Sequence, residues 1–235
     1  MTAREPLALL PGLLCDAALW RHQIDALTDI ADCRVADFTT QDSITAMAES
    51  VLAMMPKERF SLVGLSMGGY VALEIMRRTR QRVTRLALLD TRASPDRPEE
   101  TQRRRGLIEL AEKGRFKGVT PRLLPLLIHE ARLDDAVLTG EVLGMAERIG
   151  KAAFVQQQRA LMGRADCRAA LGGIGCPTLV LCGRQDALTP LAFHEDMAAA
   201  IPDVRIVVIE DCGHLSSLER PEAVTAALRE WLLSG

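Results

Sequence analysis

The sequence predicts an α/β fold with a mostly parallel central sheet, flanking helices and a helical lid inserted into the chain. Apolar runs of strand length alternate with longer segments of helical periodicity towards both ends of the sequence. Between residues 94 and 167 the strand-like runs stop, and densely charged segments with helical spacing take their place. A chain of 235 residues can bury one such core and carry one insertion.

The first half of the expected core begins with a short strand that ends at Pro11-Gly12. Further along, Ser43 can cap a helix that Pro56 brings to an end. In chain order the expected elements are a strand at Leu7–Leu10, a helix at Asp16–Ile30, a strand at Cys33–Val35, a helix at Ser43–Met55, a strand at Phe60–Leu65, a helix at Tyr70–Met76 and a strand at Arg85–Leu89.

The second half resumes this alternation after Gly172-Gly173. Its expected elements are a strand at Pro177–Cys182, a helix at Pro190–Ala200, a strand at Val204–Ile209 and a closing helix at Pro221–Leu233. Between the halves, we expect short helices separated by Pro95, Pro98, Pro121 and Pro125. We therefore assign residues 1–93 and 168–235 to the core. Residues 94–167 are expected to form a lid over the carboxyl edge of the sheet, where α/β proteins bind ligands.

Composition and charge exclude several function classes. A net charge of -2 and a pI near 6.1 give no reason to expect a nucleic-acid partner. Without a secretion signal or an apolar run of membrane length, we expect a cytoplasmic protein with no membrane partner. The four histidines lack metal-ligand spacing and no phosphate-binding glycine motif occurs, so neither a metal nor a cofactor is expected. The six cysteines are expected to be free thiols.

Ser66 lies in the most informative motif, Gly64-Leu65-Ser66-Met67-Gly68, between an expected strand and an expected helix. A serine on such a tight turn has its hydroxyl pushed out of the fold, and its strained backbone needs small neighbours. The start of the helix also places backbone N–H groups beside that hydroxyl. A flexible glycine loop in a βα turn is the alternative interpretation, so the motif by itself is a hypothesis.

Two backbone N–H groups are candidates for an oxyanion hole. Leu13 follows Pro11-Gly12 at the end of the first expected strand, and a loop there can present its N–H towards Ser66. The N–H of Met67, at the start of the helix, would be the second donor. A simple Pro-Gly turn explains the same residues without any function.

Two further side chains follow expected strands and suit a role beside a serine nucleophile. Asp186 can orient an imidazole, although an aspartate after a strand is often a turn or cap residue. His214 can reach across the sheet edge, although a lone histidine is usually structural. The chain order Ser66, Asp186, His214, with each residue just past a strand, is typical of a catalytic triad on an α/β sheet. In that triad Ser66 is the nucleophile, His214 the base and Asp186 the group that fixes its tautomer.

The chain resembles the α/β-hydrolases along nearly its whole length. The resemblance rests on Leu10-Pro11-Gly12, Gly64-Leu65-Ser66-Met67-Gly68-Gly69, Gly183-Arg184-Gln185-Asp186 and Gly213-His214-Leu215-Ser216-Ser217-Leu218-Glu219-Arg220-Pro221-Glu222. Within that superfamily it is similar to small bacterial carboxylesterases and to enol-lactone and pimeloyl-ester hydrolases, and its histidine-containing tail particularly resembles the enol-lactonases. The family often has His-Gly where this chain has Pro11-Gly12, which leaves the shape of the oxyanion loop open. The resemblance implies a serine hydrolase without a cofactor.

The expected reaction is hydrolysis of a small-molecule ester or lactone, foremost a carboxylic ester of a small or medium acyl group. Enol-lactone or C–C bond hydrolysis and a non-catalytic ligand receptor remain alternatives. Haloalkane dehalogenases and epoxide hydrolases of this fold use an aspartate nucleophile, and epoxide hydrolases also use lid tyrosines. This chain has serine at the elbow and Tyr70 as its only tyrosine. Asp90 is a rival for the acid role, and we favour Asp186 because its spacing from Gly183 matches the commoner arrangement.

The first half of the expected lid is basic. Its cationic residues are Arg103, Arg104, Arg105, Arg115, Lys117 and Arg122. A solvated helical face explains such a run. The alternative is a basic rim that attracts carboxylate-bearing substrates or an acyl carrier protein. The sequence makes no prediction of the oligomeric state.

Overall fold

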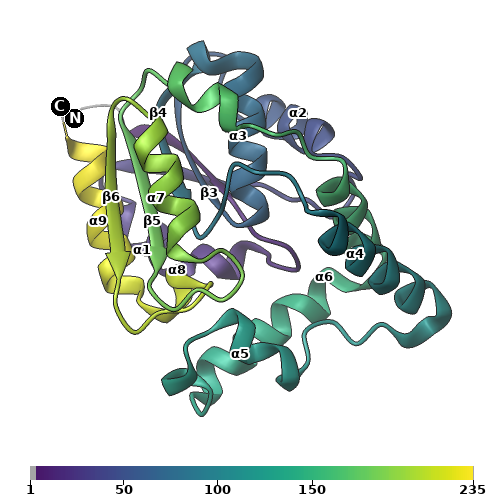
Figure 1. The fold of residues 1–235 in the computed structure, drawn as a ribbon. Coiled ribbons are helices and arrows are strands. Elements are labelled where there is room, and N and C mark those ends of the chain that lie inside the picture. The colour runs from purple at the N-terminus through teal and green to yellow at the C-terminus, as the bar shows by residue number, and fades with distance from the viewer. Residues whose placement is uncertain (1–3, 235) are drawn as a thin grey trace.

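The computed structural model describes residues 4–234 and is built on a six-stranded sheet (Figure 1). Its strands are β1 (Glu5–Leu10), β2 (Ala31–Val35), β3 (Phe60–Leu65), β4 (Val83–Leu89), β5 (Thr178–Gly183) and β6 (Val204–Ile209). The order is β2-β1-β3-β4-β5-β6, and every neighbouring pair is parallel. The predicted α/β fold is confirmed.

Helices cover both faces of the sheet. One face carries α2 (Ile44–Met54), α3 (Met67–Thr79) and α7 (Leu191–Ala200), and the other carries α1 (Arg21–Leu27) and α9 (Pro221–Leu233). Strand β1 shows how both faces become apolar: Leu7 and Leu9 join the cluster beneath α1 and α9, whereas Ala8 and Leu10 join the cluster beneath α2 and α3. A strand buried on both sides reads as a continuous apolar run, which is why the sequence pattern located central strands such as β3 and β5, whereas the edge strands β2 and β6 are partly exposed.

The strand order reverses between β1 and β3. From β1 the chain moves outward to β2, and it then returns to the opposite side of β1 with β3. Open α/β sheets bind ligands at the carboxyl ends of the strands beside such a reversal. The loops that leave these two strands contain Leu13 and Ser66.

The inserted segment, residues 94–167, is helical. It contains α4 (Pro98–Leu110), a π-helical turn η3 (Ala111–Arg115), η4 (Pro121–Leu123), α5 (Leu124–Leu127), η5 (Glu130–Arg132) and α6 (Ala136–Met162). Figure 1 draws α4, α5 and α6 together, to one side of the sheet. The longest element, α6, has 27 residues and consists of two helical stretches that meet at a kink. No proline occurs within α6, and its change of direction comes at Gly150, where φ is 75°.

Several element boundaries also differ from the prediction, and β1 and β4 each start two residues earlier than expected. The expected helix at Asp16–Ile30 is a 3₁₀ turn, η1 (Ala17–Trp20), followed by α1, and the buried Trp20 lies at the junction with φ -109° and ψ 6°. Strand β2 starts two residues earlier than expected, and α3 starts directly after Ser66. The remaining short helices are η2 (Arg80–Arg82), η6 (Arg168–Gly173) and α8 (Ser216–Glu219). Within residues 4–234, no helix has both the length and the hydropathy needed to cross a membrane.

Candidate active site

Ser66 occupies the turn between β3 and α3 in a strained backbone conformation. Its φ is 55° and its ψ is -113°, a region that costs a residue other than glycine about 1–3 kcal/mol. The surrounding structure holds this conformation through backbone hydrogen bonds. The Ser66 N–H donates to the carbonyl oxygen of Leu89 at 3.0 Å, and the Ser66 carbonyl accepts from the N–H of Gly69 at 2.9 Å and the hydroxyl of Thr91 at 2.8 Å.

The glycines around Ser66 are required because β1, β3 and α3 pack closely there. A Cβ atom on Gly64 would collide with the carbonyl group of Gly68, and one on Gly68 would collide with the carbonyl group of Leu10. A Cβ atom on Gly69 would overlap the side chain of Thr91. The prediction that these glycines make room for the turn is confirmed. The same packing explains why α3 includes Gly68 and Gly69 although glycine disfavours helices by about 1 kcal/mol per residue.

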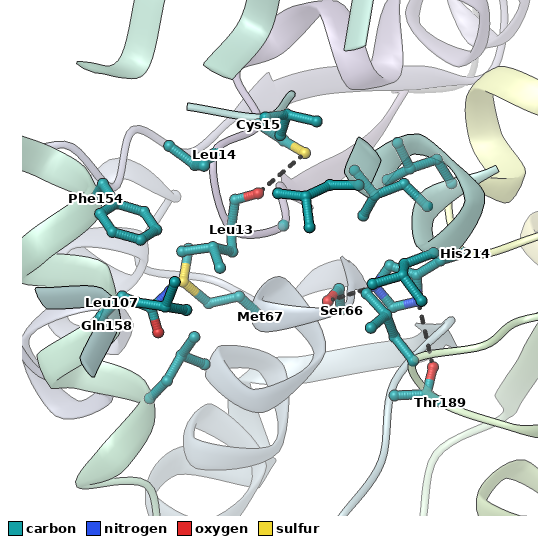
Figure 2. Close-up of a pocket in the computed structure, with 18 of the residues that line it drawn as sticks. Leu13, Leu14, Cys15, Ser66, Met67, Leu107, Phe154, Gln158, Thr189 and His214 are labelled. Atoms are coloured by element: carbon teal, nitrogen blue, oxygen red, sulfur yellow. Dashed lines mark hydrogen bonds between the residues drawn. The ribbon is translucent and has the colours of Figure 1, made fainter. Parts of the chain in front are cut away.

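A continuous line of hydrogen bonds joins Ser66, His214 and Asp186. Ser66 Oγ lies 2.8 Å from His214 Nε2, a contact drawn in Figure 2, and His214 Nδ1 lies 2.8 Å from Asp186 Oδ2. These residues follow β3, β6 and β5, so three separate strand ends meet here. His214 and Asp186 are buried, with exposed fractions of 3% and 4%, whereas Ser66 is half-buried. Such a line can transfer the hydroxyl proton of Ser66 to the imidazole.

Asp186 acts both as a turn residue and as the partner of His214. Its Oδ1 accepts the N–H groups of Leu188 at 2.8 Å and Thr189 at 2.9 Å, and its Oδ2 accepts the Thr189 hydroxyl at 2.6 Å. Burial by itself would raise the pKa of Asp186, but the nearby His214 and these hydrogen bonds lower it below its usual value. Burial by itself would likewise lower the pKa of His214, and the Asp186 carboxylate raises it above the ordinary value.

Asp90, the rival acid, has other partners. It follows β4 with a positive φ of 46°, and its Oδ1 accepts the N–H of Gly183 at 3.1 Å. Its Oδ2 accepts the N–H of Ser216 at 3.3 Å and the hydroxyl of Ser216 at 2.5 Å. Complete burial and then repulsion from Asp186 raise the pKa of Asp90 well above its usual value. The contact with the His214 imidazole therefore belongs to Asp186.

Gln157, a residue of the inserted segment, binds the loop after β1 and fixes its position. Leu14, with a positive φ of 59°, donates its N–H to Gln157 Oε1 at 3.0 Å. Gln157 comes from α6, is 1% exposed and donates from Nε2 to the carbonyl oxygen of Phe38 at 3.1 Å. No local sequence signal marks this glutamine, because the bond to Leu14 spans 143 residues. Leu13 and Met67 lie in the wall of the same cavity as Ser66 (Figure 2).

The cavity beside Ser66 has a volume of about 280 Å³. Most of its wall is apolar and comes from the inserted segment, with Leu107, Val119, Leu123, Leu126, Leu127, Val142, Met145, Phe154 and Leu161. The polar lining residues from the same segment are Glu100, Arg103, Arg104 and Gln158, and Arg92 precedes it. This wall suits an aliphatic ligand that carries at least one polar group.

The loop that carries His214 is fastened to the inserted segment. The carbonyl oxygen of Leu127 accepts the N–H groups of His214 at 3.1 Å and Leu215 at 3.0 Å. The buried Glu219 adds a second connection, since its Oε1 accepts the N–H of Gly213 at 2.9 Å and its Oε2 accepts the N–H of His129 at 2.6 Å. Glu219 belongs to the tail motif of the sequence, but its role in joining two segments is visible only in three dimensions. Within the described residues, no cluster of metal-ligating side chains occurs.

Known proteins resemble this chain along most of its length. Residues 9–227 match the model of the Alpha/beta hydrolase family. The pimeloyl-[acyl-carrier protein] methyl ester esterase of Aromatoleum aromaticum is 31% identical over 195 residues, which cover 77% of this chain and 76% of that protein. A thermophilic esterase from Thermogutta terrifontis is 32% identical with a TM-score of 0.88, covering 97% of this chain and 89% of that one. The enol-lactonase from Burkholderia xenovorans LB400 is 24% identical with a TM-score of 0.88, covers 99% and 93% of the two chains, and shares the fold.

Proposed function

Because the chain belongs to the alpha/beta hydrolase family, we propose that it is a serine hydrolase that cleaves a carboxylic ester through an acyl-enzyme intermediate. The observation that carries this proposal is the hydrogen-bonded line from Ser66 through His214 to Asp186, which begins at the wall of an apolar cavity. The two relatives above 30% identity that are named as esterases support an ester as the substrate. A cavity of about 280 Å³ is small among ligand sites, which favours a small or medium acyl group.

The proposed reaction follows the contacts of the three side chains. His214 Nε2 accepts the proton of Ser66 Oγ as this oxygen attacks the ester carbonyl carbon, and Asp186 stabilises the resulting imidazolium. His214 then gives this proton to the departing alkoxide, leaving the acyl group on Ser66. A water molecule, deprotonated by His214, attacks the acyl-enzyme; the proton then returns to Ser66 as the acid leaves.

The negative charge on the carbonyl oxygen is proposed to be stabilised by the N–H groups of Leu13 and Met67. Both residues lie in the cavity wall with Ser66, and α3 directs its N-terminal end at the turn. Each donor of such a pair lowers the barrier by roughly 3–4 kcal/mol. The bond from Leu14 to Gln157 supports a fixed course for the loop on which Leu13 lies.

We also propose that residues 94–167 act as the lid of this site. Support comes from the cavity wall, most of whose apolar side chains belong to this segment. The bonds of Leu127 and His129 to the His214 loop argue that the part around α5 stays fixed. Substrate entry would then depend on α4 and the turn that follows it.

The substrate class can be tested by comparing esters with lactones. We expect p-nitrophenyl esters from acetate to decanoate to be hydrolysed, with the highest kcat/KM at short or medium chains, because the cavity is small. Enol-lactones and simple lactones run under the same conditions should give lower kcat/KM. Lactone opening without measurable ester hydrolysis would replace the ester proposal by the lactonase alternative.

The raised pKa of His214 predicts how activity depends on pH. The imidazole must be neutral to accept the Ser66 proton, so kcat/KM falls as the pH drops through the pKa of His214. Because Asp186 holds this pKa above its ordinary value of about 6.5, we expect the acid limb of kcat/KM to have its midpoint above about pH 6.5. An NMR titration of the His214 ring in Ser66→Ala should give a midpoint above the same value. A midpoint below it would contradict the proposed pairing.

A further inference from the structure

One part of the cavity wall is cationic. Arg92, Arg103 and Arg104 line it together with Glu100. Arg92 follows β4, whereas the other three residues come from α4, so core and inserted segment meet at this wall. Figure 2 shows where it lies: Gln158, whose Oε1 accepts from Arg104 Nη1 at 2.8 Å, stands at the opposite end of the view from His214. The side-chain amide that Arg104 bonds therefore lies away from the imidazole in this view.

Neighbouring carboxylates only partly balance this wall. Arg92 Nη2 lies 2.8 Å from Glu100 Oε2 and 3.3 Å from Asp96 Oδ1, and Arg104 Nε lies 2.6 Å from Asp96 Oδ2. Arg164, behind the wall, contacts the same Asp96 at 2.6 Å. Arginine hydrogen bonds help to keep the pKa of Asp96 and Glu100 below their usual values despite burial, so both are charged at neutral pH. Arg97 also lies 3.6 Å from Glu100 and 3.2 Å from Glu99, so four guanidinium groups share three carboxylates and one positive charge is left over.

Part of this charge lacks a hydrogen-bond partner. Arg92 Nε and Arg164 Nη2 are buried nitrogen atoms without an acceptor among the described residues, and their side chains are 6% and 2% exposed. An unpaired buried donor destabilises the folded protein, and of these two residues Arg92 lines the cavity, so an acceptor that reaches its Nε is favoured. Arg103 is exposed at the cavity and, within residues 4–234, forms no ion pair.

The cationic wall is close enough to Ser66 for one small molecule to contact both. Thr91, the residue before Arg92, donates its hydroxyl to the Ser66 carbonyl at 2.8 Å. Tyr70 lies one helical turn after Ser66 on α3, lines the cavity and has the Arg164 guanidinium 4.4 Å above its ring centroid. The cavity wall around these groups is mostly leucine, methionine and phenylalanine. A ligand with a reactive carbonyl at one end, an aliphatic middle and an anion at the other end matches this order.

We propose that Arg92, Arg103 and Arg104 form a carboxylate subsite, and that the preferred substrates are half-esters of aliphatic dicarboxylic acids. Guanidinium groups bind carboxylates through paired hydrogen bonds, which makes arginine more selective here than lysine. The burial of Arg92 favours a small-molecule carboxylate, since a carrier protein docked on the surface would not reach it. This inference rests on the proposed ester hydrolysis and names the chemical class of its substrate.

The test compares two methyl esters that differ only at the far end. One is the half-ester with a free carboxylate, from succinate to suberate, and the other carries a carboxamide there. Hydrolysis of the methyl esters is measured from the acid that it releases. Methyl esters replace p-nitrophenyl esters here because the free carboxylate of a short p-nitrophenyl half-ester attacks its own ester group. For the best spacer we expect the wild-type protein to hydrolyse the carboxylate ester with at least about tenfold higher kcat/KM. Dividing one rate by the other in each variant removes differences in active-enzyme concentration.

Arg103 and Arg105 provide a matched pair of variants. Both are exposed arginines of α4 without an ion pair among the described residues, and only Arg103 lines the cavity. We expect Arg103→Gln to reduce the carboxylate-to-carboxamide ratio about three- to tenfold and Arg105→Gln to leave it unchanged. Arg92→Gln should reduce it by more than about tenfold. If that variant fails to fold, the Arg103 and Arg105 comparison still decides.

The outcomes separate this inference from the proposed function. A wild-type ratio near one, with both esters hydrolysed, overturns the subsite and leaves the esterase standing. An equal loss in Arg103→Gln and Arg105→Gln that disappears at high salt also overturns it, because that pattern indicates only a long-range field. No hydrolysis of either ester contradicts the proposed function itself.

Discussion

Replacing Ser66 by alanine is expected to lower kcat/KM for esters by about 10⁴- to 10⁶-fold and to abolish labelling by a fluorophosphonate probe. The alanine removes the oxygen that His214 Nε2 contacts at 2.8 Å, so no acyl or phosphonyl group can be attached there. The residual rate should come only from binding and the oxyanion hole. Rates are measured with the p-nitrophenyl esters and labelling with a fluorescent probe after electrophoresis.

Cys15 supplies the control for this labelling. Its thiol lines the same cavity, and burial raises the pKa of this thiol to about 12, so it stays protonated at neutral pH. We expect Cys15→Ala still to be labelled. Labelling that persists in Ser66→Ala would contradict the assignment of the nucleophile. A wild-type protein that binds ligands but is never labelled would favour the receptor alternative.

Asp186→Asn is expected to lower kcat by about 10⁴-fold, whereas Asp90→Asn should lower it by less than about tenfold. An amide at position 186 cannot stabilise the imidazolium, and its NH₂ group can force His214 into the wrong tautomer. Asp90 bonds Ser216 and Gly183 instead, so its change breaks no hydrogen bond to the imidazole and acts on it through charge and through the position of the loop. Rates on one ester should be compared under saturating conditions.

Thermal unfolding is the matching control for these two variants. Asp90 is fully buried and both its oxygens accept backbone N–H groups, so the NH₂ group of asparagine leaves one of them without an acceptor and Asp90→Asn should unfold at a lower temperature. Asp186→Asn should show a measurable decrease in unfolding temperature relative to the wild-type protein. It should still be fully folded at the assay temperature. The reverse order of activities, with Asp90→Asn inactive and Asp186→Asn active, would transfer the acid role to Asp90.

Residues at strand ends were predictable from the sequence because their signal is local. Ser66 lies between an apolar run and the glycines that allow β1 and α3 to pack closely. The turn and the nucleophile that it carries are therefore both encoded within a few neighbouring residues. Asp186 follows β5, a fully buried apolar run, whereas His214 follows β6, a partly exposed edge strand that is still rich in valine and isoleucine. The parallel sheet then brings their ends together, and no further information is needed to place the three side chains on one edge.

Contacts between the inserted segment and the core were not predictable in the same way. The basic run on α4 was recognised, but the pairing of Arg104 with Asp96 and the approach of Arg92 from β4 have no local pattern. The kink of α6 at Gly150 was not predicted either, because only prolines were used to divide the inserted segment. Such features depend on side-chain contacts between segments that are far apart in the sequence. A single sequence has no local pattern that predicts these contacts.

The hydrogen bond from Leu14 to Gln157 couples the loop after β1 to the inserted segment, so sequence changes in one constrain the other. In a chimaera that exchanges residues 94–167 for those of a relative, Leu14 would lose its acceptor unless the donor chain carried an amide at the same place. The shape of the loop and the choice of substrate are therefore constrained to change together. Recombination that diversifies such enzymes should succeed most often when its crossover points keep this pair of partners from one parent.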